Sequence, residues 1–175
     1  MLVERLDEMR LTLKDEKQIA RLLQVSMKAE YDGRSYYQNR FHCRLVIREN
    51  SEIVGHLGLA FRAIRLGEVI INCIGIGDVA VDPKHRGKGF GSLLIEEMIK
   101  EGRLTRAEFA LLFGQRALYA ATGFRKAANR LTSTQMIGAQ TGETKSAPHD
   151  YFMVMALGER SWDETQTVDL SGYPF

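Results

Sequence analysis

The chain has 175 residues, a mass of 19.8 kDa and a formal net charge of +2, with 45% hydrophobic and 26% charged residues. This length and composition suit one globular domain that buries its own core, which we place at residues 1–175. The net charge is too small to favour a nucleic-acid partner, and no apolar run is long enough to cross a membrane. Residues 1–5 are too charged for a signal peptide, so we expect a cytoplasmic protein.

The cysteines and histidines lack the spacing of a disulfide framework or a metal site. Cys43 and Cys73 stand alone, and each is expected to be a reduced residue of the core. The histidines are also scattered singly, at His42, His56, His85 and His149. We therefore expect no bound metal.

The N-terminal part of the chain predicts a strand followed by a helix. The strand is expected within residues 1–11, although its pattern is weak. Thr12 and Asp15 have the spacing of a capping box and predict a helix start. One face of this helix, at helical spacing, consists of Ile19, Leu22, Leu23, Ser26 and Met27.

A meander of antiparallel strands is predicted next. Residues 43–48 and 52–61 are apolar runs separated by a short turn, which favours a hairpin. A second turn at 66–68 leads into an apolar, β-branched run at 74–81 that is typical of a buried strand. Pro83 ends this strand, because proline cannot donate a hydrogen bond to a neighbouring strand.

A glycine-rich turn connects this strand to a helix. The turn has the sequence R-G-K-G-F-G at residues 86–91. The helix after it is predicted by the spacing of Leu94, Ile95, Met98 and Gly102. Free N–H groups at a helix start attract anions, and glycines allow a phosphate to approach them closely. The alternative is a flexible basic turn that binds nothing, but the flanking strand and helix favour a pyrophosphate site.

Two common phosphate-binding motifs are excluded by spacing. The Walker pattern G-x-x-x-x-G-K-[ST] does not occur in the chain. The dinucleotide fingerprint G-x-G-x-x-G also fails, because Ser92 or Leu94 stands where its third glycine is required.

The rest of the chain predicts a parallel strand pair and further strands. Residues 107–113 form an apolar strand, and a strand–helix–strand unit implies that the two strands are parallel. Residues 116–122 predict a short helix, with Gly123 suited to its C-terminal cap. Strands are then expected at 132–137 and 151–157.

Two segments of the C-terminal part are not expected to form strands. Residues 138–149 are polar and contain two glycines and a proline, which indicates a loop. The tail at 158–175 is polar except for Trp162 and a few apolar residues near its end.

The motifs resemble those of the GNAT N-acyltransferases. Arg86, Gly89 and Gly91 match the family's R-x-x-G-x-G, and V-A-V-D-P precedes them at 79–83. Y-A-A-T-G-F at 119–124 is similar to the family's Y-x-x-x-G-F. The resemblance implies an α/β (mixed α+β) fold, with a twisted mixed sheet of about six or seven strands flanked by about four helices.

The resemblance also implies acetyl-CoA as the cosubstrate, with its pyrophosphate at the glycine-rich turn and its thiol arm along the preceding strand. The cofactor-binding residues that it implies are Val79, Ala80, Val81, Arg86, Gly87, Lys88, Gly89, Phe90, Gly91 and Ser92. In this reading the Val79 amide is the candidate for polarising the thioester carbonyl, a role that any residue type could fill. Tyr119 aligns with the tyrosine that often protonates the departing thiolate, and the alternative is a tyrosine that only packs on the sheet.

Asp78 is the second candidate catalytic residue. Strand alternation places Asp78 and Ala80 on the face opposite Val79 and Val81. A carboxylate in a half-buried strand is hydrogen-bonded, paired or functional, so Asp78 either takes a proton from the acceptor or pairs with a group such as Arg62. GNAT proteins often carry a glutamate on this strand, where this chain has glycines, and the weaker alternatives for the base are Glu68 and Glu108.

The resemblance implies direct transfer of acetyl to a primary amine of a small molecule or peptide. A route through an acyl-cysteine is disfavoured because neither cysteine has a base beside it in the sequence. The alternatives are a coenzyme A-sensing module without turnover and a toxin-type enzyme acting on aminoacyl-tRNA. A homodimer remains an option.

Two further segments bear on the acceptor. Residues 29–40 correspond to the variable region that commonly shapes the acceptor pocket in this family, although their tyrosines also suit a sheet edge. The tail is faintly similar to aminoglycoside 2′-acetyltransferase-like proteins, in which it approaches the acceptor site. Aromatic residues that hold a chain end on the surface explain the same pattern.

Overall fold

The computed structural model describes residues 2–27, 31–137 and 140–175. Within these residues it has ten strands, three α-helices and two short 3₁₀ helices. They form two compact units, Met1–Ala60 with Gly77–Lys100 and Phe61–Ile76 with Glu101–Phe175. Strands β3 (Glu52–Leu66) and β4 (Val69–Val81) each contribute a segment to both units. A single domain over the whole chain stays a prediction.

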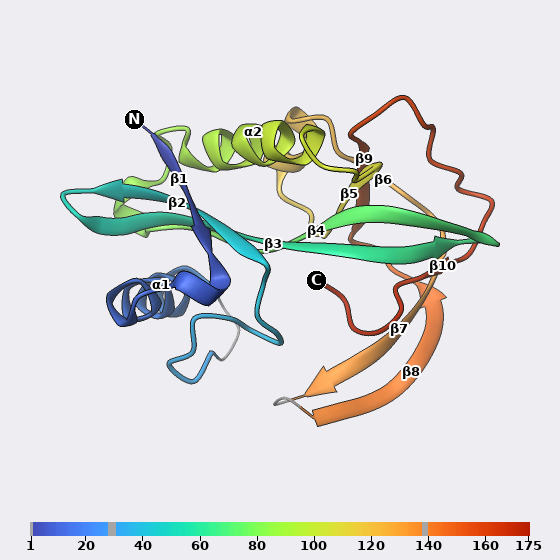
Figure 1. Cartoon of the computed structure of the whole chain (residues 1–175), viewed down its shortest axis with the longest axis horizontal. Helices are drawn as coiled ribbons and strands as arrows, with labels where there is room; N and C mark the ends of the chain where they lie inside the picture. The colour runs from blue at the N-terminus through green and yellow to red at the C-terminus, as the bar shows by residue number, and fades with distance from the viewer. Residues whose placement is uncertain (1, 28–30, 138–139) are drawn as a thin grey trace. The chain divides into compact units, whose positions relative to one another are not determined.

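The first unit contains an antiparallel sheet with a helix on each side. β1 (Val3–Asp7) pairs with β2 (Cys43–Glu49), and β2 pairs with β3. Helices α1 (Leu13–Ser26) and α2 (Phe90–Arg103) lie on opposite sides of this sheet (Figure 1). The side facing α1 is a buried cluster that includes Ile19, Leu22, Leu23, Val46 and Ala80.

Helix α1 begins where the capping box predicts. The Thr12 side chain accepts a hydrogen bond from the Asp15 backbone N–H, and the Asp15 carboxylate accepts one from the Thr12 N–H. The two bonds satisfy N–H groups that a helix start leaves without partners. The predicted helix start is confirmed.

The predicted order of strand, glycine-rich turn and helix is also confirmed. β4 ends at Val81, the 3₁₀ helix η2 (Pro83–His85) follows, and α2 begins at Phe90. Leu94, Ile95 and Met98 of α2 are completely buried. The apolar face of α2 thus fixes the helix on the sheet, and the turn is held between two rigid elements.

The second unit contains the predicted parallel pair. β4 and β5 (Phe109–Phe113) run parallel, with Cys73 opposite Phe109 and Ile76 opposite Leu112. β5 pairs with β9 (Phe152–Ala156), and β9 pairs with β6 (Arg125–Lys126). The short helix α3 (Ala117–Ala121) follows β5.

The other edge of this unit is built from β3 and a hairpin. β10 (Val168–Asp169) lies between β3 and β7 (Arg130–Ile137), and β7 pairs with β8 (Gln140–Pro148). The loop predicted at 138–149 is therefore wrong over 140–148, while residues 138 and 139 lie outside the described residues. Every residue of β8 is exposed, so no alternation of apolar and polar residues marked it as a strand.

The tail belongs to the core of the second unit. Trp162, Val168 and Leu170 are buried in one cluster with Phe109 and Phe152. The tail therefore contributes to the core through these three residues, whereas the aromatic residues at its end, Tyr173 and Phe175, are half-buried. The buried tail also explains why its few apolar residues are spaced irregularly, since they fill gaps in a core and do not follow a helix or strand period.

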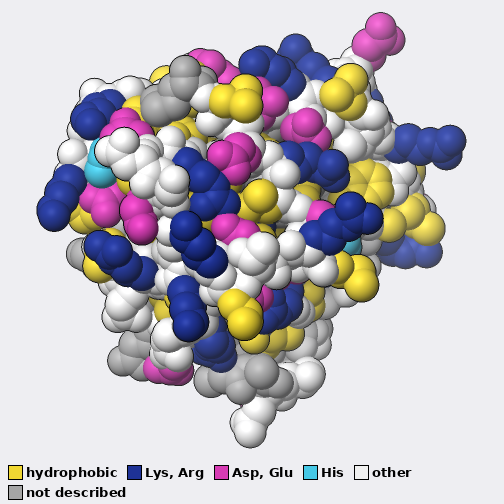
Figure 2. Space-filling view, turned by 60° about the vertical axis from the view of Figure 1, so that its left-hand side comes forward, with side chains coloured by type: hydrophobic (Ala, Val, Ile, Leu, Met, Phe, Trp, Pro, Cys, Tyr) yellow, Lys and Arg dark blue, Asp and Glu magenta, His cyan; other side chains and the backbone are white. Residues whose placement is uncertain are grey.

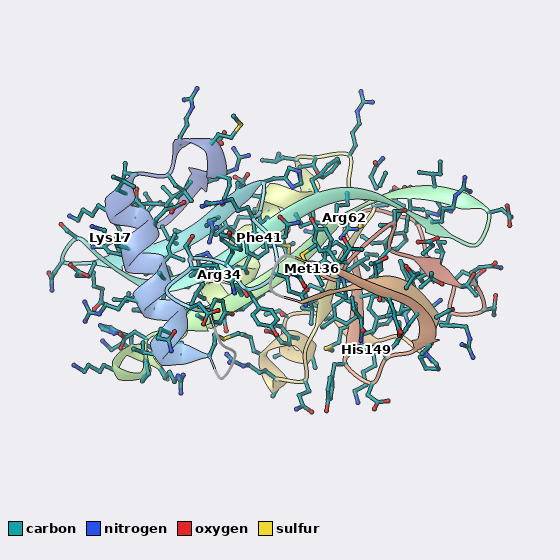
Figure 3. All side chains as sticks on the ribbon, turned by 90° about the horizontal axis from the view of Figure 1, so that it is seen from below. Lys17, Arg34, Phe41, Arg62, Met136 and His149 are labelled. Atoms are coloured by element: carbon teal, nitrogen blue, oxygen red, sulfur yellow. The ribbon has the colours of Figure 1, made fainter. Side chains whose placement is uncertain are left out.

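Arg62 on β3, labelled in Figure 3, contacts the last residues of the tail. Its guanidinium lies 4.9 Å from the ring centroids of both Tyr173 and Phe175. It also donates hydrogen bonds to the carbonyl oxygens of Leu170 and Tyr173. The Phe175 ring lies where a side chain at Gly75 would stand.

We expect Gly75→Ala to lower the free energy of unfolding by about 1–3 kcal/mol, because the new methyl group overlaps the Phe175 ring. The cost should shrink when Phe175 is also alanine, since the overlap is then absent. Urea unfolding of the two single variants and the double variant measures this coupling. Gly158→Ala, where a methyl group meets no atom within 4 Å, is the control. An equal cost of Gly75→Ala in both backgrounds would contradict the packing described.

Candidate active site

The glycine-rich turn presents unpaired N–H groups at the start of α2. Gly87 and Gly89 have φ angles of +78° and +80°, in the left-handed region that favours glycine. A Cβ atom at either position would meet no atom within 4 Å, so the space beside the turn is open. Within the described part of the chain, the backbone N–H groups of residues 89–92 have no hydrogen-bond acceptor. This arrangement suits an anion at the positive end of the helix dipole.

The side chains of the turn differ in how readily they could contact a bound ligand. Arg86 is exposed and donates one hydrogen bond, to the Ser26 carbonyl oxygen at 3.3 Å. The Lys88 ammonium is 4.0 Å from the Glu49 carboxylate, a contact through solvent-exposed groups that leaves it free to reach a ligand. Phe90 is buried, so this residue can serve the site only through its backbone N–H.

The strand β4 is kinked at Asp78. Asp78 has φ +51°, which is unusual for a residue other than glycine. The two residues that follow it, Val79 and Ala80, are both buried. The Asp78 carboxylate bonds to Tyr31, and Tyr31 belongs to the same buried cluster as Ala80, so both residues lie near Tyr31. That Asp78 and Ala80 share one face, opposite Val79, stays a prediction.

The Asp78 carboxylate is held by hydrogen bonds from the segment that precedes β2. It accepts one from the Tyr31 hydroxyl at 2.8 Å and one from the Tyr37 backbone N–H at 3.2 Å. Burial raises the pKa of Asp78, and the hydrogen bond from Tyr31 acts in the opposite direction. The suggested pairing with Arg62 is not observed, since the hydrogen bonds of Arg62 go to the tail.

A buried polar network lies next to Asp78 and was not singled out by the sequence. Arg44 is completely buried and forms two hydrogen bonds with the Glu8 carboxylate, at 2.7 and 2.8 Å. Its Nη1 atom lies 3.2 Å from His56 Nε2, and His56 Nδ1 lies 2.8 Å from the Asp78 carbonyl oxygen. Burial lowers the pKa of His56 to about 3, so the ring is neutral. The only sequence signal was an isolated histidine in an apolar strand.

Tyr119 belongs to the second unit, on helix α3. Its ring packs against Gly114, where any side chain would overlap it, and lies edge-on to Phe124. The structure places no hydrogen-bond partner near the Tyr119 hydroxyl among residues 2–27, 31–137 and 140–175. Burial raises the pKa of Tyr119, so the phenol keeps its proton at neutral pH.

The predicted site residues thus fall in two groups. Asp78, Val79, Ala80, Val81 and the turn Arg86–Ser92 all belong to the first unit. Tyr119 belongs to the second unit. The part of the 29–40 segment that contacts Asp78 lies within residues 31–37, whereas residues 29 and 30 fall outside the described residues.

The remaining candidates are engaged elsewhere. Glu108 accepts a hydrogen bond from Arg160 at 2.7 Å. Cys43 and Cys73 are buried free thiols, and burial raises the pKa of Cys73 to about 12, which makes it a poor nucleophile. No group of His, Cys, Asp and Glu that could hold a metal occurs among the described residues. No helix in this part of the chain is both long and apolar enough to span a membrane.

Several solved structures of similar fold are of N-acetyltransferases. The E. coli GNAT family N-acetyltransferase YhbS, in complex with CoA, is 22% identical, with a TM-score of 0.64 over 96% of this chain and 88% of that one. A GNAT family acetyltransferase from Brucella melitensis, in complex with acetyl-CoA, is 19% identical, with a TM-score of 0.60 over 95% and 94% of the two chains. The E. coli ribosomal-protein-S18-alanine N-acetyltransferase is 15% identical, with a TM-score of 0.60 over 93% and 98%.

These similarities confirm the predicted mixed α+β fold class, although the described residues form ten strands where about six or seven were expected. No curated protein matches the chain. The profile of the acetyltransferase (GNAT) domain family matches residues 9–127. Because this match covers more than half of the chain, the protein belongs to the GNAT acetyltransferase family.

Proposed function

We propose that this protein transfers an acetyl group from acetyl-CoA to a primary amine of a small molecule or peptide. The observation that carries the proposal is the row of unpaired N–H groups at residues 89–92, at the start of a helix and behind two left-handed glycines. Family membership and the similar structures that contain CoA or acetyl-CoA support the same ligand. A cytoplasmic location stays an expectation from the sequence.

The turn would bind the pyrophosphate of the cofactor. The backbone N–H groups of Gly89, Phe90, Gly91 and Ser92 would donate to its oxygens, and Arg86 and Lys88 would add positive charge. Residues 79–81 would hold the thiol arm through backbone groups. The thioester that acetyl-CoA supplies is the activated acyl donor, and the Val79 N–H would stabilise the oxyanion that forms when the amine attacks.

Two side chains would move protons. Asp78 would accept a proton from the acceptor ammonium, for which its raised pKa brings it closer to neutral pH than an ordinary carboxylate. Tyr119 would donate a proton to the departing thiolate, since its hydroxyl is protonated and lacks a partner among the described residues. Attack by the amine would precede protonation of the thiolate, and no acyl-enzyme intermediate is required.

The proposal is tested by titrating the purified protein with acetyl-CoA in a calorimeter and then measuring thiol release with a panel of amines. Saturable binding with amine-dependent thiol release supports it. Binding without turnover on any amine would indicate a coenzyme A-sensing module instead. The absence of acetyl-CoA binding would contradict the proposal directly.

The aminoacyl-tRNA alternative requires a surface that binds RNA. On the face drawn in Figure 2, Lys and Arg side chains are interspersed with Asp and Glu and form no continuous basic surface. Such mixing gives little of the phosphate neutralisation that RNA binding depends on. Salt-dependent binding to tRNA would favour this alternative over a small amine.

We expect Asp78→Asn to lower kcat/KM about 100-fold at neutral pH, because the proton acceptor is lost. Higher pH should restore part of the rate, since more of the acceptor amine is then already neutral. A pH profile of the amine reaction measures this effect. In the unsubstituted protein, the rate should fall as pH drops through the pKa of Asp78, which burial raises above its usual range.

Tyr31→Phe is the matched variant for this experiment. Tyr31→Phe keeps the Asp78 carboxylate but removes the hydrogen bond that lowers its pKa. The decrease in rate that occurs as the pH is lowered should therefore begin at a higher pH. A loss of rate in Asp78→Asn that is the same at every pH would assign Asp78 a structural role.

A further inference from the structure

The network of Glu8, Arg44 and His56 connects a buried ion pair to the backbone of β4. Arg44 donates to Glu8 through Nε and Nη2, which fixes the guanidinium plane. Its remaining Nη1 group donates to the Ser35 carbonyl oxygen and points to His56 Nε2. All of these residues belong to the first unit, and Arg44 and His56 are completely buried.

The partners of His56 determine which ring nitrogen carries the proton. The Asp78 carbonyl oxygen can only accept, so the Nδ1 atom at 2.8 Å from it must be the donor. Arg44 can only donate, so Nε2 must be the acceptor at 3.2 Å. Both ring nitrogens are thereby satisfied in a single tautomer of a neutral ring.

The bond from His56 acts on a peptide unit that has an unusual conformation. Asp78 has φ +51°, a conformation that costs a residue other than glycine about 1–2 kcal/mol and persists only where its surroundings hold it. The carboxylate of Asp78 is held by Tyr31 and Tyr37, and its carbonyl oxygen is held by His56. Because a peptide unit is planar, the direction of the Asp78 C=O also sets the direction of the Val79 N–H.

We propose that Glu8, Arg44 and His56 are positioning residues that orient the Asp78–Val79 peptide and so aim the Val79 N–H at the acyl carbonyl. This inference rests on the proposed function, in which the Val79 N–H stabilises the oxyanion. It assigns a role to a buried network to which the proposed function gives none.

The test compares variants of His56 that keep either the hydrogen bond to the Asp78 carbonyl oxygen or the contact with Arg44. In His56→Asn the side-chain amide nitrogen takes the place of Nδ1 and can still donate to the Asp78 carbonyl oxygen. In His56→Gln the amide lies nearer the position of Nε2, towards Arg44, and His56→Leu keeps neither contact. His149→Leu, at an exposed histidine of the second unit (Figure 3), is the control for loss of a ring.

We expect His56→Gln and His56→Leu to lower kcat about tenfold or more while the Kd for acetyl-CoA stays within about twofold, because a misdirected oxyanion donor affects the transition state and not the bound cofactor. His56→Asn should keep most of kcat, and the control should keep all of it. An equal loss of kcat in His56→Asn and His56→Leu would overturn the inference. So would an effect on the Kd for acetyl-CoA alone, or an unchanged kcat in a folded His56→Leu protein.

A second measurement does not depend on turnover. Nuclear magnetic resonance of the unliganded protein should show the proton on Nδ1 of His56. The Val79 amide resonance should shift in His56→Leu but stay near its original position in His56→Asn. If the protein lacks acetyl transfer altogether, the proposed function fails while these resonances still report on the network. A proton on Nε2 of His56 would contradict the hydrogen bonds assigned to this network. A Val79 resonance that is unchanged in all three His56 variants would do the same.

Discussion

Gly89→Ala is expected to weaken acetyl-CoA binding by about tenfold or more. Gly89 has φ +80°, where an alanine costs about 1–2 kcal/mol. The turn can avoid this cost only by rotating its backbone, and rotation turns the N–H groups of residues 89–92 away from the pyrophosphate. Because a Cβ atom at Gly89 meets no atom within 4 Å, the substitution acts through the backbone and not through a clash.

Gly33→Ala is the matched control for this prediction. Gly33 has φ +73°, and a Cβ atom there also meets no atom within 4 Å. The two variants should therefore lose a similar free energy of unfolding, while only Gly89→Ala loses affinity in calorimetric titration. Equal affinity for acetyl-CoA in the two variants would remove the turn from the binding site.

Tyr119→Phe should lower kcat by about 100-fold and leave the Kd for acetyl-CoA unchanged. The hydroxyl is the proposed acid for the thiolate, and proton transfer by a positioned side chain typically contributes about 100-fold or more. The ring contacts with Gly114 and Phe124 are kept in phenylalanine, so the fold should not change. Steady-state kinetics and calorimetry together separate the two effects.

The pH dependence of the same reaction provides a sharper test. Burial raises the pKa of Tyr119, so the acid should remain protonated up to pH values above the ordinary range of a tyrosine. The rate should fall only when the phenol ionises, and this alkaline fall should be missing in Tyr119→Phe. Tyr151→Phe, at an exposed tyrosine of the same unit, is the control and should behave like the unsubstituted protein. Unchanged kcat in Tyr119→Phe would exclude the acid role.

Most elements were predictable because their signals are local. The capping box of Thr12 and Asp15 involves residues of one helical turn. The glycine-rich turn and the apolar face of α2 are also encoded within a short stretch, and the structure confirms both. In contrast, β8 was missed because all of its side chains are exposed, and its strand conformation depends on pairing with β7.

The environment of Asp78 could not be predicted from the residues near it in the sequence. The residue type suggested a functional or paired carboxylate, but no local pattern predicted the left-handed backbone at Asp78. Its hydrogen-bond partners come from the Tyr31–Tyr37 segment and from β3, which approach it only after the chain folds.

The amino-acid order therefore identified the family motifs, the glycine-rich turn and the helix that follows it, since each depends on residues that are neighbours in the chain. The buried contacts of Glu8, Arg44 and His56 emerge only when residues far apart in the chain are packed together. A buried charge or imidazole is stable only when every polar atom finds a partner, and those partners are set by the three-dimensional arrangement of separate strands.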